Sequence, residues 1–168
     1  MLEHLTRYLR VGLQRTRNGN STLAEELELL RAYLEIQAIR MGPRLHYEIH
    51  DAGSLSQVPI PPLLIQPLVE NAVTHGLAPQ IPGGRIDIHF RRDADRFSIE
   101  VADTGRGLDD DGGGGVGLKN IRDRLAGLYG DRAQLTLPQN APTGVVATLT
   151  LPLRAEDLAS AGAPSRRP

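Results

Sequence analysis

The sequence contains no cysteine and no tryptophan, and only one of its basic side chains is a lysine, Lys119. Without cysteine the chain cannot form a disulfide framework, a thiolate zinc site, an iron–sulfur cluster or a cysteine nucleophile. No apolar run approaches the roughly 18 residues that a membrane-spanning helix needs, and the N-terminus lacks the apolar core of a secretory signal. The 19 basic and 20 acidic residues give a net charge of -1, which argues against nucleic-acid binding through bulk positive charge.

At 168 residues the chain is long enough to bury one hydrophobic core. Apolar spacing predicts two helices first, over residues 2–15 and 22–41. The second opens with Thr22 and Glu25 at the spacing of a capping box and stops at Gly42. Two further helices are predicted over residues 62–76 and 116–129, and short strands over 45–49, 85–90, 97–101, 134–137 and 145–153. Strands grouped around helices in this way predict a two-layer α/β sandwich.

The chain divides into three parts on this pattern. Residues 1–42 form a helical segment without a catalytic pattern, which predicts a packing or dimerisation surface with a connecting role. Residues 43–153 form the α/β domain. Residues 154–168 are rich in alanine, serine, proline and arginine, a composition that predicts disorder.

The helix predicted over residues 62–76 carries a compact polar group. Glu70, Asn71, Thr74 and His75 fall on one side of it, opposite a broad apolar face. One interpretation is that these side chains simply face water. The alternative is a site, because an asparagine beside a glutamate supplies the oxygen ligands or water-positioning groups that suit Mg²⁺.

A second candidate lies at the end of the strand predicted over residues 97–101. Asp103 is followed by Gly105 and Gly107, which lets the backbone turn and a flat ligand lie close while the carboxylate accepts a hydrogen bond from an exocyclic amine. An ordinary turn has the same residues. The Asp-Thr-Gly sequence would also fit an aspartic protease, but a single copy in a chain of this size would require a homodimer.

A third candidate is the glycine run over residues 112–115, which leads directly into a helix. Free amides at a helix N-terminus, together with the helix dipole, bind anions such as phosphate. The plain alternative is a flexible linker. The glycines at 112, 114 and 117 match the dinucleotide fingerprint formally, but no βαβ unit surrounds them, and the chain has no P-loop motif.

The order of these three motifs resembles the N, G1 and G2 boxes of the GHKL ATPases, and within them the sensor histidine kinases of the LytS type. The segments that carry the resemblance are residues 61–76 (PPLLIQPLVENAVTHG), 101–108 (VADTGRGL), 115–125 (GVGLKNIRDRL) and, upstream, 22–45. Together they span most of residues 22–153. Each box alone is weak, whereas three in order with a matching upstream helix are a strong signal.

The resemblance implies a Bergerat α/β sandwich that holds ATP and Mg²⁺. Asn71 would supply its side-chain oxygen to the metal, and Asp103 would accept the adenine amine. His75 would line the phosphate side, and Glu70 would act as a base or position water. Backbone positions would complete nucleotide binding: Gly105 and Gly107 beside the base, and Gly115, Val116, Gly117 and Leu118 beside the phosphates.

The activity implied is transfer of the ATP γ-phosphoryl group to a histidine located outside this sequence, because the family's Asn-Pro-His-Phe type of acceptor motif is absent and His4 has none of its neighbours. The chain is then a fragment that begins inside the dimerisation region, or its acceptor lies on another protein. The alternative function is a nucleotide-dependent regulatory module of the same fold, an anti-sigma-like switch without kinase activity.

The resemblance also implies partners and a location. It implies a response regulator, plausibly with a LytTR-type output, a homodimer in the full-length kinase, and no nucleic acid as a partner. It places the domain in the cytoplasm and anchors its parent protein in the membrane. The family's lid is very short here, at residues 108–115, and valine follows Gly144 where the family often has threonine. We therefore assign no threonine ligand.

Overall fold

The structure is a computed structural model that describes residues 21–107, 116–154 and 157. The helix expected over residues 2–15, the lid at 108–115 and nearly all of the tail lie outside the described residues. The helices are α2 (Leu23–Met41), α3 (Gln66–Asn71), which continues as the π-helical segment η3 (Ala72–Leu77), and α4 (Val116–Tyr129). The strands are β1 (Ser21–Thr22), β2 (Leu45–Ile49), β3 (Pro59–Ile60), β4 (Gly84–Asp93), β5 (Arg96–Asp103), β6 (Gln134–Thr136) and β7 (Val146–Pro152).

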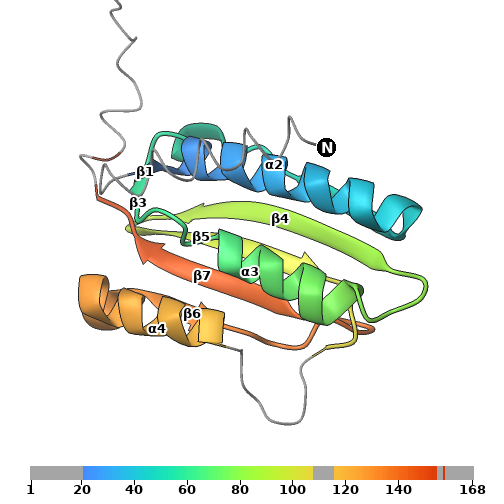
Figure 1. Cartoon of the computed structure of the whole chain (residues 1–168). Coiled ribbons are helices and arrows are strands. Elements are labelled where there is room, and N and C mark those ends of the chain that lie inside the picture. Colours follow the sequence, from blue (N-terminus) through green and yellow to red (C-terminus); the bar gives the residue numbers. More distant parts are fainter. Residues whose placement is uncertain (1–20, 108–115, 155–156, 158–168) are drawn as a thin grey trace, which may run out of the picture.

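Five strands form one sheet in the order β2-β4-β5-β7-β6, and β1 pairs with β3 in a separate two-stranded ribbon. Strands β2 and β4 are parallel, joined by the crossover that contains α3, and every other pair in the sheet is antiparallel. Helices α2, α3 and α4 lie side by side across one face of the sheet (Figure 1). The predicted two-layer α/β sandwich is confirmed.

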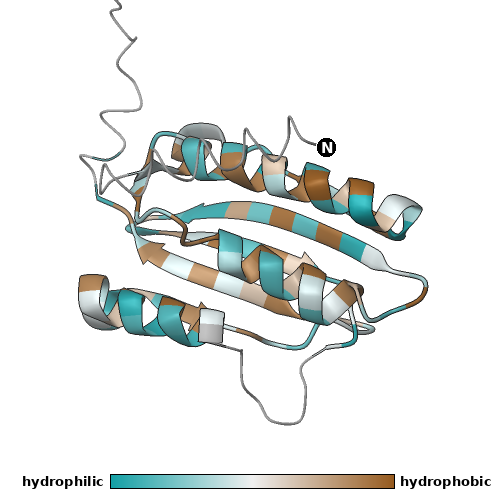
Figure 2. Ribbon diagram, in the orientation of Figure 1, coloured by the Kyte–Doolittle hydropathy of each residue, from teal (hydrophilic) through white to brown (hydrophobic). Residues whose placement is uncertain are grey.

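The core lies between the sheet and these helices. Side chains alternate between buried and partly exposed along β5 and β7, as expected for a sheet with one covered face, and hydropathy alternates along β4 in the same way (Figure 2). The buried apolar residues of β4, β5 and β7 are Ile86, Ile88, Phe97, Ile99, Val101, Ala147, Leu149 and Leu151. The five strands predicted for the sheet are therefore present, with β4 and β5 extended at both ends, whereas β1 and β3 were not predicted.

Helix α2 begins as its capping box predicts. The Thr22 hydroxyl accepts a hydrogen bond from the Glu25 amide at 3.3 Å, and the Glu25 carboxylate accepts one from the Thr22 amide at 2.9 Å. The leucines expected on its apolar face are buried in the same core as the sheet. Thus the helix that we expected in a connecting segment packs within the α/β unit, while the division of the chain at residue 42 stays a prediction.

The helix predicted over residues 62–76 begins later and is less regular than its apolar spacing indicated. Leu63 has a left-handed backbone (φ 57°), so the α-helix begins only at Gln66. The carboxylate of Glu26, which is 2% exposed, accepts hydrogen bonds from the amides of Leu63 at 3.0 Å and Leu64 at 3.2 Å. A long-range contact from α2 thereby sets where α3 starts.

We expect Glu26→Ala to destabilise the fold by about 1–3 kcal/mol, because it leaves the buried Leu64 amide without this acceptor. Urea unfolding of the variant measures the change. Glu28→Ala, an exposed position on the same helix, is the control and should lower the free energy of unfolding by less than Glu26→Ala does, about 0–1 kcal/mol, the usual contribution of an exposed ion pair. Equal stability of the two variants would contradict the role given to Glu26.

Helix α4 covers the residues predicted for it, and Leu118, Ile121 and Leu125 are buried as expected. Leu128 continues the same apolar spacing but is 53% exposed, and it lines a second hollow together with Pro61 and Pro152. No helix in the described part of the chain combines the length and apolar character needed to cross a bilayer.

Candidate functional site

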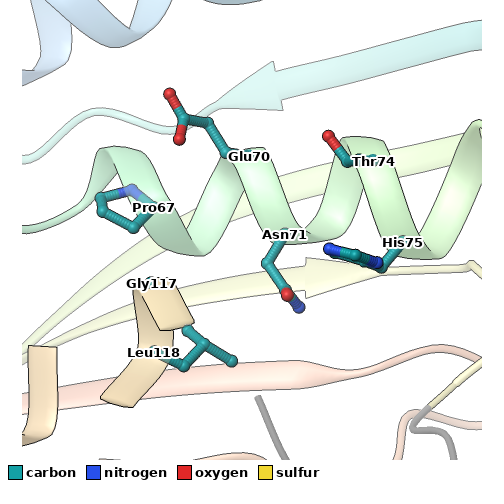
Figure 3. A pocket seen from close by; sticks show the side chains of 7 residues that line it. All are labelled: Pro67, Glu70, Asn71, Thr74, His75, Gly117 and Leu118. Atoms are coloured by element: carbon teal, nitrogen blue, oxygen red, sulfur yellow. The ribbon is translucent and has the colours of Figure 1, made fainter. Parts of the chain in front are cut away.

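A hollow of about 230 Å³ lies between α3, η3 and the start of α4 (Figure 3). Its lining residues are Pro67, Glu70, Asn71, Thr74, His75, Gly117 and Leu118. Two motifs that are more than 40 residues apart in the sequence therefore share one pocket. All four members of the polar group predicted on the helix over residues 62–76 are among the lining residues.

The polar side chains that line the pocket point in two directions. Asn71 and His75 project toward the beginning of α4, whereas Glu70 and Thr74 point away from it (Figure 3). Gln66, one helical turn before Glu70, donates a hydrogen bond from Nε2 to Glu70 Oε1 at 2.6 Å. Gln66 thus orients the carboxylate, a role that the sequence pattern did not reveal.

The helix widens into a π-helix where it passes the pocket. In η3 the Ala78 amide donates to the Val73 carbonyl, five residues earlier, at 2.8 Å. Such π-helical turns occur frequently at functional sites. Here the wider turn contains Thr74, His75 and Gly76, so it carries part of the pocket wall and also presents Gly76 to the loop after β5.

That loop packs directly against the helix. The Asp103 side chain, at the end of β5, accepts a hydrogen bond from the Gly105 amide at 2.8 Å. A Cβ atom on Gly76 would lie 3.0 Å from Asp103 Oδ1, and a Cβ atom on Gly105 would lie 2.5 Å from the Gly76 backbone. Close approach of these two backbones therefore requires glycine at 105.

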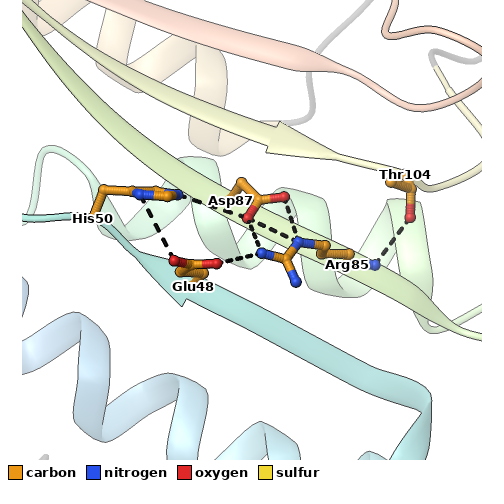
Figure 4. A network of polar contacts seen from close by, with 5 residues as sticks. All are labelled: Glu48, His50, Arg85, Asp87 and Thr104. Carbon is orange, nitrogen blue, oxygen red and sulfur yellow. Dashed lines mark hydrogen bonds and ion pairs between the residues drawn. The ribbon is translucent and has the colours of Figure 1, made fainter.

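The loop is also attached to the sheet. The Thr104 hydroxyl accepts a hydrogen bond from the Arg85 amide at 2.9 Å (Figure 4), and the Thr104 amide donates to the Arg85 carbonyl at 3.1 Å. On the other side, Gly144 (φ 109°) lies so close that a Cβ atom there would be 1.9 Å from the Asp103 carbonyl oxygen. Gly144 is thus a packing contact of the Asp103 loop, a role that the sequence around it did not indicate.

Asp103 is a carboxylate held largely away from water, 4% exposed. Burial raises the pKa of its carboxyl above the ordinary value of 3.8, and hydrogen bonds from the backbone of Gly105 and Val145 oppose the rise. A buried carboxylate of this kind is kept at a cost in stability. Perturbed groups beside a pocket are candidates for function.

We expect Asp103→Asn to raise the free energy of unfolding of the nucleotide-free protein at neutral pH. The Asp103 carboxyl binds its proton more tightly in the folded protein than in the unfolded chain. Its contribution to stability is therefore fully present below the ordinary pKa and is lost as the pH rises through the raised pKa. Urea unfolding between about pH 4 and pH 8 tests this. The wild-type protein should lose more stability across that range than the variant, and parallel pH profiles would contradict the prediction.

Arg44, just before β2, holds the segment that follows η3. Its guanidinium donates to the carbonyl oxygens of Ile81 at 2.9 Å and Ala78 at 3.1 Å, and to that of Gln80. Gly83 lies against the Arg44 backbone, where a Cβ atom would clash. Arg44 therefore fixes the segment that directly follows the pocket-lining helix, and no sequence motif pointed to it.

The structure brings most of the expected site residues together. Five line the pocket, namely Glu70, Asn71, His75, Gly117 and Leu118. Asp103 and Gly105 adjoin it through Gly76, and Gly107 (φ 90°) follows on the same loop near Gly144. Gly115 and the side chain of Val116 lie outside the described residues.

Comparison with known proteins matches the same segments. The family model of histidine kinase-, DNA gyrase B- and HSP90-like ATPases matches residues 61–155, and the histidine kinase model matches residues 1–45. Sensor protein LytS of Staphylococcus haemolyticus is 35% identical over 148 residues, 80% of this chain and 25% of LytS. The chain spans about a quarter of the length of the curated relatives it matches.

Solved structures share the fold. The histidine kinase domain of the blue-light activated kinase from Erythrobacter litoralis EL346 has a TM-score of 0.62 at 19% identity, covering 94% of this chain and 76% of that one. Histidine kinase ThkA, solved in complex with the response regulator TrrA, has a TM-score of 0.58 at 15% identity, covering 92% and 49%.

The family model of ATPases covers more than half of the chain and includes the helix, the loop after β5 and the start of α4 that meet around the pocket. Membership of this family implies that the domain binds a nucleotide. Along most of its length the chain is similar to the sensor protein LytS, and it belongs to the family of histidine kinase-, DNA gyrase B- and HSP90-like ATPases.

Proposed function

We propose that this domain binds ATP together with Mg²⁺ and transfers the γ-phosphoryl group to a histidine imidazole outside residues 21–154. The observation that carries the proposal is the shared pocket, in which Asn71 faces the beginning of α4. An amide oxygen on one wall and the positive end of a helix dipole on the other suit a metal-bound polyphosphate.

The residues present fit a magnesium ion. Mg²⁺ takes oxygen ligands and keeps several waters, so one protein oxygen from Asn71 beside the phosphates suffices. When bound, the ion neutralises charge on the phosphates. The beginning of α4, at Gly117 and Leu118, forms the opposite wall of the pocket and offers backbone amides there. His75 lies beside Asn71 on the same side of the α3–η3 helix.

Recognition of the adenine base is assigned to Asp103. Its side chain is buried at the end of β5 and is oriented by a hydrogen bond from the Gly105 amide. Its carboxylate accepts a hydrogen bond from the exocyclic amine. Asp103→Ala should weaken ATP binding by roughly 1.5–3 kcal/mol, the contribution of a hydrogen bond to a charged group. Equal affinity of the original protein for ATP and GTP would argue against this assignment.

In the transfer, a nitrogen of the acceptor imidazole forms a bond to the γ-phosphorus while the bond between the γ-phosphorus and the β–γ bridging oxygen of ATP breaks. ADP leaves with the electron pair, and the proton on the other ring nitrogen passes to a base. Glu70, held by Gln66 at the edge of the pocket, is proposed as that base. The remaining contribution is positioning and charge stabilisation, which dominate phosphoryl transfer.

The proposed partners follow from the relatives. ThkA was solved with a response regulator, and we assign a response regulator to this kinase as well, with a LytTR-type output. The full-length kinase is proposed to be a homodimer anchored in the membrane, with this domain on the cytoplasmic side.

Phosphotransfer from radiolabelled ATP to a separately supplied dimerisation segment that contains the acceptor histidine tests the activity. Calorimetry with Mg²⁺ and ADP on the intact chain tests nucleotide binding. We expect both to succeed. Binding without any transfer would indicate a nucleotide-dependent switch of the same fold, and absence of binding would refute the whole proposal.

A further inference from the structure

The face of the sheet opposite the helices carries a second group of chemically active side chains. In the described part of the chain no helix covers this face (Figure 1). Alternate residues of β2 and β4 point outward there, as does His50 directly after β2, and Figure 4 shows four of these side chains close together: Glu48, His50, Asp87 and Arg85. His89 lies on the same face of β4, two residues beyond Asp87.

Strand register brings the two histidines together. Ile49 of β2 pairs with Ile88 of β4, and the His50 amide donates to the Ile88 carbonyl at 3.0 Å. This places His50 beside His89, and their rings stack with centroids 4.0 Å apart and an angle of 19° between the planes. Both side chains are partly buried, so their positions are restrained by neighbouring strands.

One donor atom from each of His50, Asp87 and His89 lies within 4.8 Å of the other two. His50 Nε2 is 4.0 Å from an oxygen of Asp87. Two imidazole nitrogens and one carboxylate oxygen are a donor set used for zinc and other borderline divalent metals, whereas Mg²⁺ prefers oxygen alone. This set differs in kind from the oxygen ligand expected beside ATP, and it lies on the opposite side of the sheet.

The local charge also favours a cation. Glu48 lies 3.8 Å from His50 Nδ1, and Glu100 of β5 is directly paired with His89. Arg85 contacts both Glu48 and Asp87. The carboxylates of Glu48, Asp87 and Glu100 therefore lie near the two histidines, and the Arg85 guanidinium offsets only part of their negative charge. A divalent ion would offset the remainder.

We propose that His50, Asp87 and His89 form a binding site for a zinc-like divalent cation on the open face of the sheet, separate from the nucleotide pocket. Stacked rings cannot both direct their in-plane nitrogens at one ion, so binding requires the rings to rotate until the donors lie about 2.0–2.2 Å from it. The His50 side chain is 37% exposed, which leaves room for this rotation. The ion must also compete with Arg85 for Asp87, because Arg85 Nε lies 2.7 Å from its nearer oxygen.

Calorimetry with Zn²⁺ on the full chain, with Mg²⁺ in the buffer and no nucleotide, tests the proposal. We expect one saturable zinc site per chain. His50→Ala and His89→Ala should each weaken it at least about tenfold, since even groups that only support a ligand contribute 10–100-fold. The matched control is His46→Ala. His46 is an exposed histidine of β2 that pairs with Arg85 of β4, and it lies outside the cluster of His50, Asp87 and His89. It should bind zinc as the original protein does.

The unfolding temperature, measured with and without Zn²⁺, distinguishes loss of the zinc site from poor folding of a variant. Zn²⁺ should raise the unfolding temperature of the original protein and of His46→Ala, because an ion that binds only the folded state stabilises it. It should not raise that of His50→Gln or His89→Gln, whose side chains keep polar character and similar size. Zinc affinity unchanged in the His50 and His89 variants, or no saturable zinc binding by the original protein, would overturn the proposal.

Discussion

Asn71→Ala is expected to abolish the binding of magnesium-complexed nucleotide while leaving the fold intact. Asn71 supplies the one amide oxygen that projects from the helix toward the start of α4, and alanine is a good helix former. If Asn71 is the metal ligand proposed above, its loss should weaken binding by at least about 100-fold, more than loss of a group that only supports a ligand. Calorimetry with ADP and Mg²⁺ measures the affinity, and circular dichroism confirms that the variant is folded.

The control for this prediction is Asn120→Ala. Asn120 is an exposed asparagine on α4, outside the lining of the pocket, so its replacement should leave nucleotide affinity within about twofold, as for surface changes away from any special contact. A second comparison repeats the titration of Asn71→Ala without Mg²⁺. If Asn71 acts through the metal, the variant and the original protein should then differ little, and an unchanged affinity in Mg²⁺ would remove the metal assignment.

Gly105→Ala is expected to destabilise the protein and to remove nucleotide binding at the same time. The added Cβ atom would lie 2.5 Å from the Cα and carbonyl carbon of Gly76, and both partners are buried backbone that cannot turn aside as a flexible side chain would. Overpacking of this kind costs about 1–3 kcal/mol. The loop can relieve the clash only by moving away from η3, which displaces Asp103. Urea unfolding and ADP calorimetry on the same samples measure the two effects.

Gly127→Ala is the matched control for the glycine variant. Gly127 is exposed on α4, and a Cβ atom there would meet nothing within 4 Å. Removing a glycine from a helix interior should therefore stabilise the fold by up to about 1 kcal/mol, with no change in ADP affinity. Equal stability of the Gly105 and Gly127 variants would show that the approach of the two backbones is less close than the structure indicates.

Local patterns were sufficient for most of the secondary structure. The capping box at Thr22 and Glu25 predicted the start of α2, and alternation predicted the strands of the sheet. Both signals are local. A capping side chain accepts hydrogen bonds from amides in the first turn of the helix, and alternating apolar residues show that one face of a strand is buried. The prediction failed where distant residues intervened, as when Glu26 bound the amides before α3.

The sequence by itself determined the family and the residue types of the site, because the motif around Asn71, the loop at Asp103 and the glycines before α4 follow one another in a specific order. Tertiary structure alone decided how they meet. It placed Gly76 against Gly105 and Gly144 against Asp103, and it stacked His50 on His89 across two strands. The physical reason is that spacing along a chain reports which side of an element a residue faces, whereas backbone clearances and side-chain clusters depend on how separate elements pack in three dimensions.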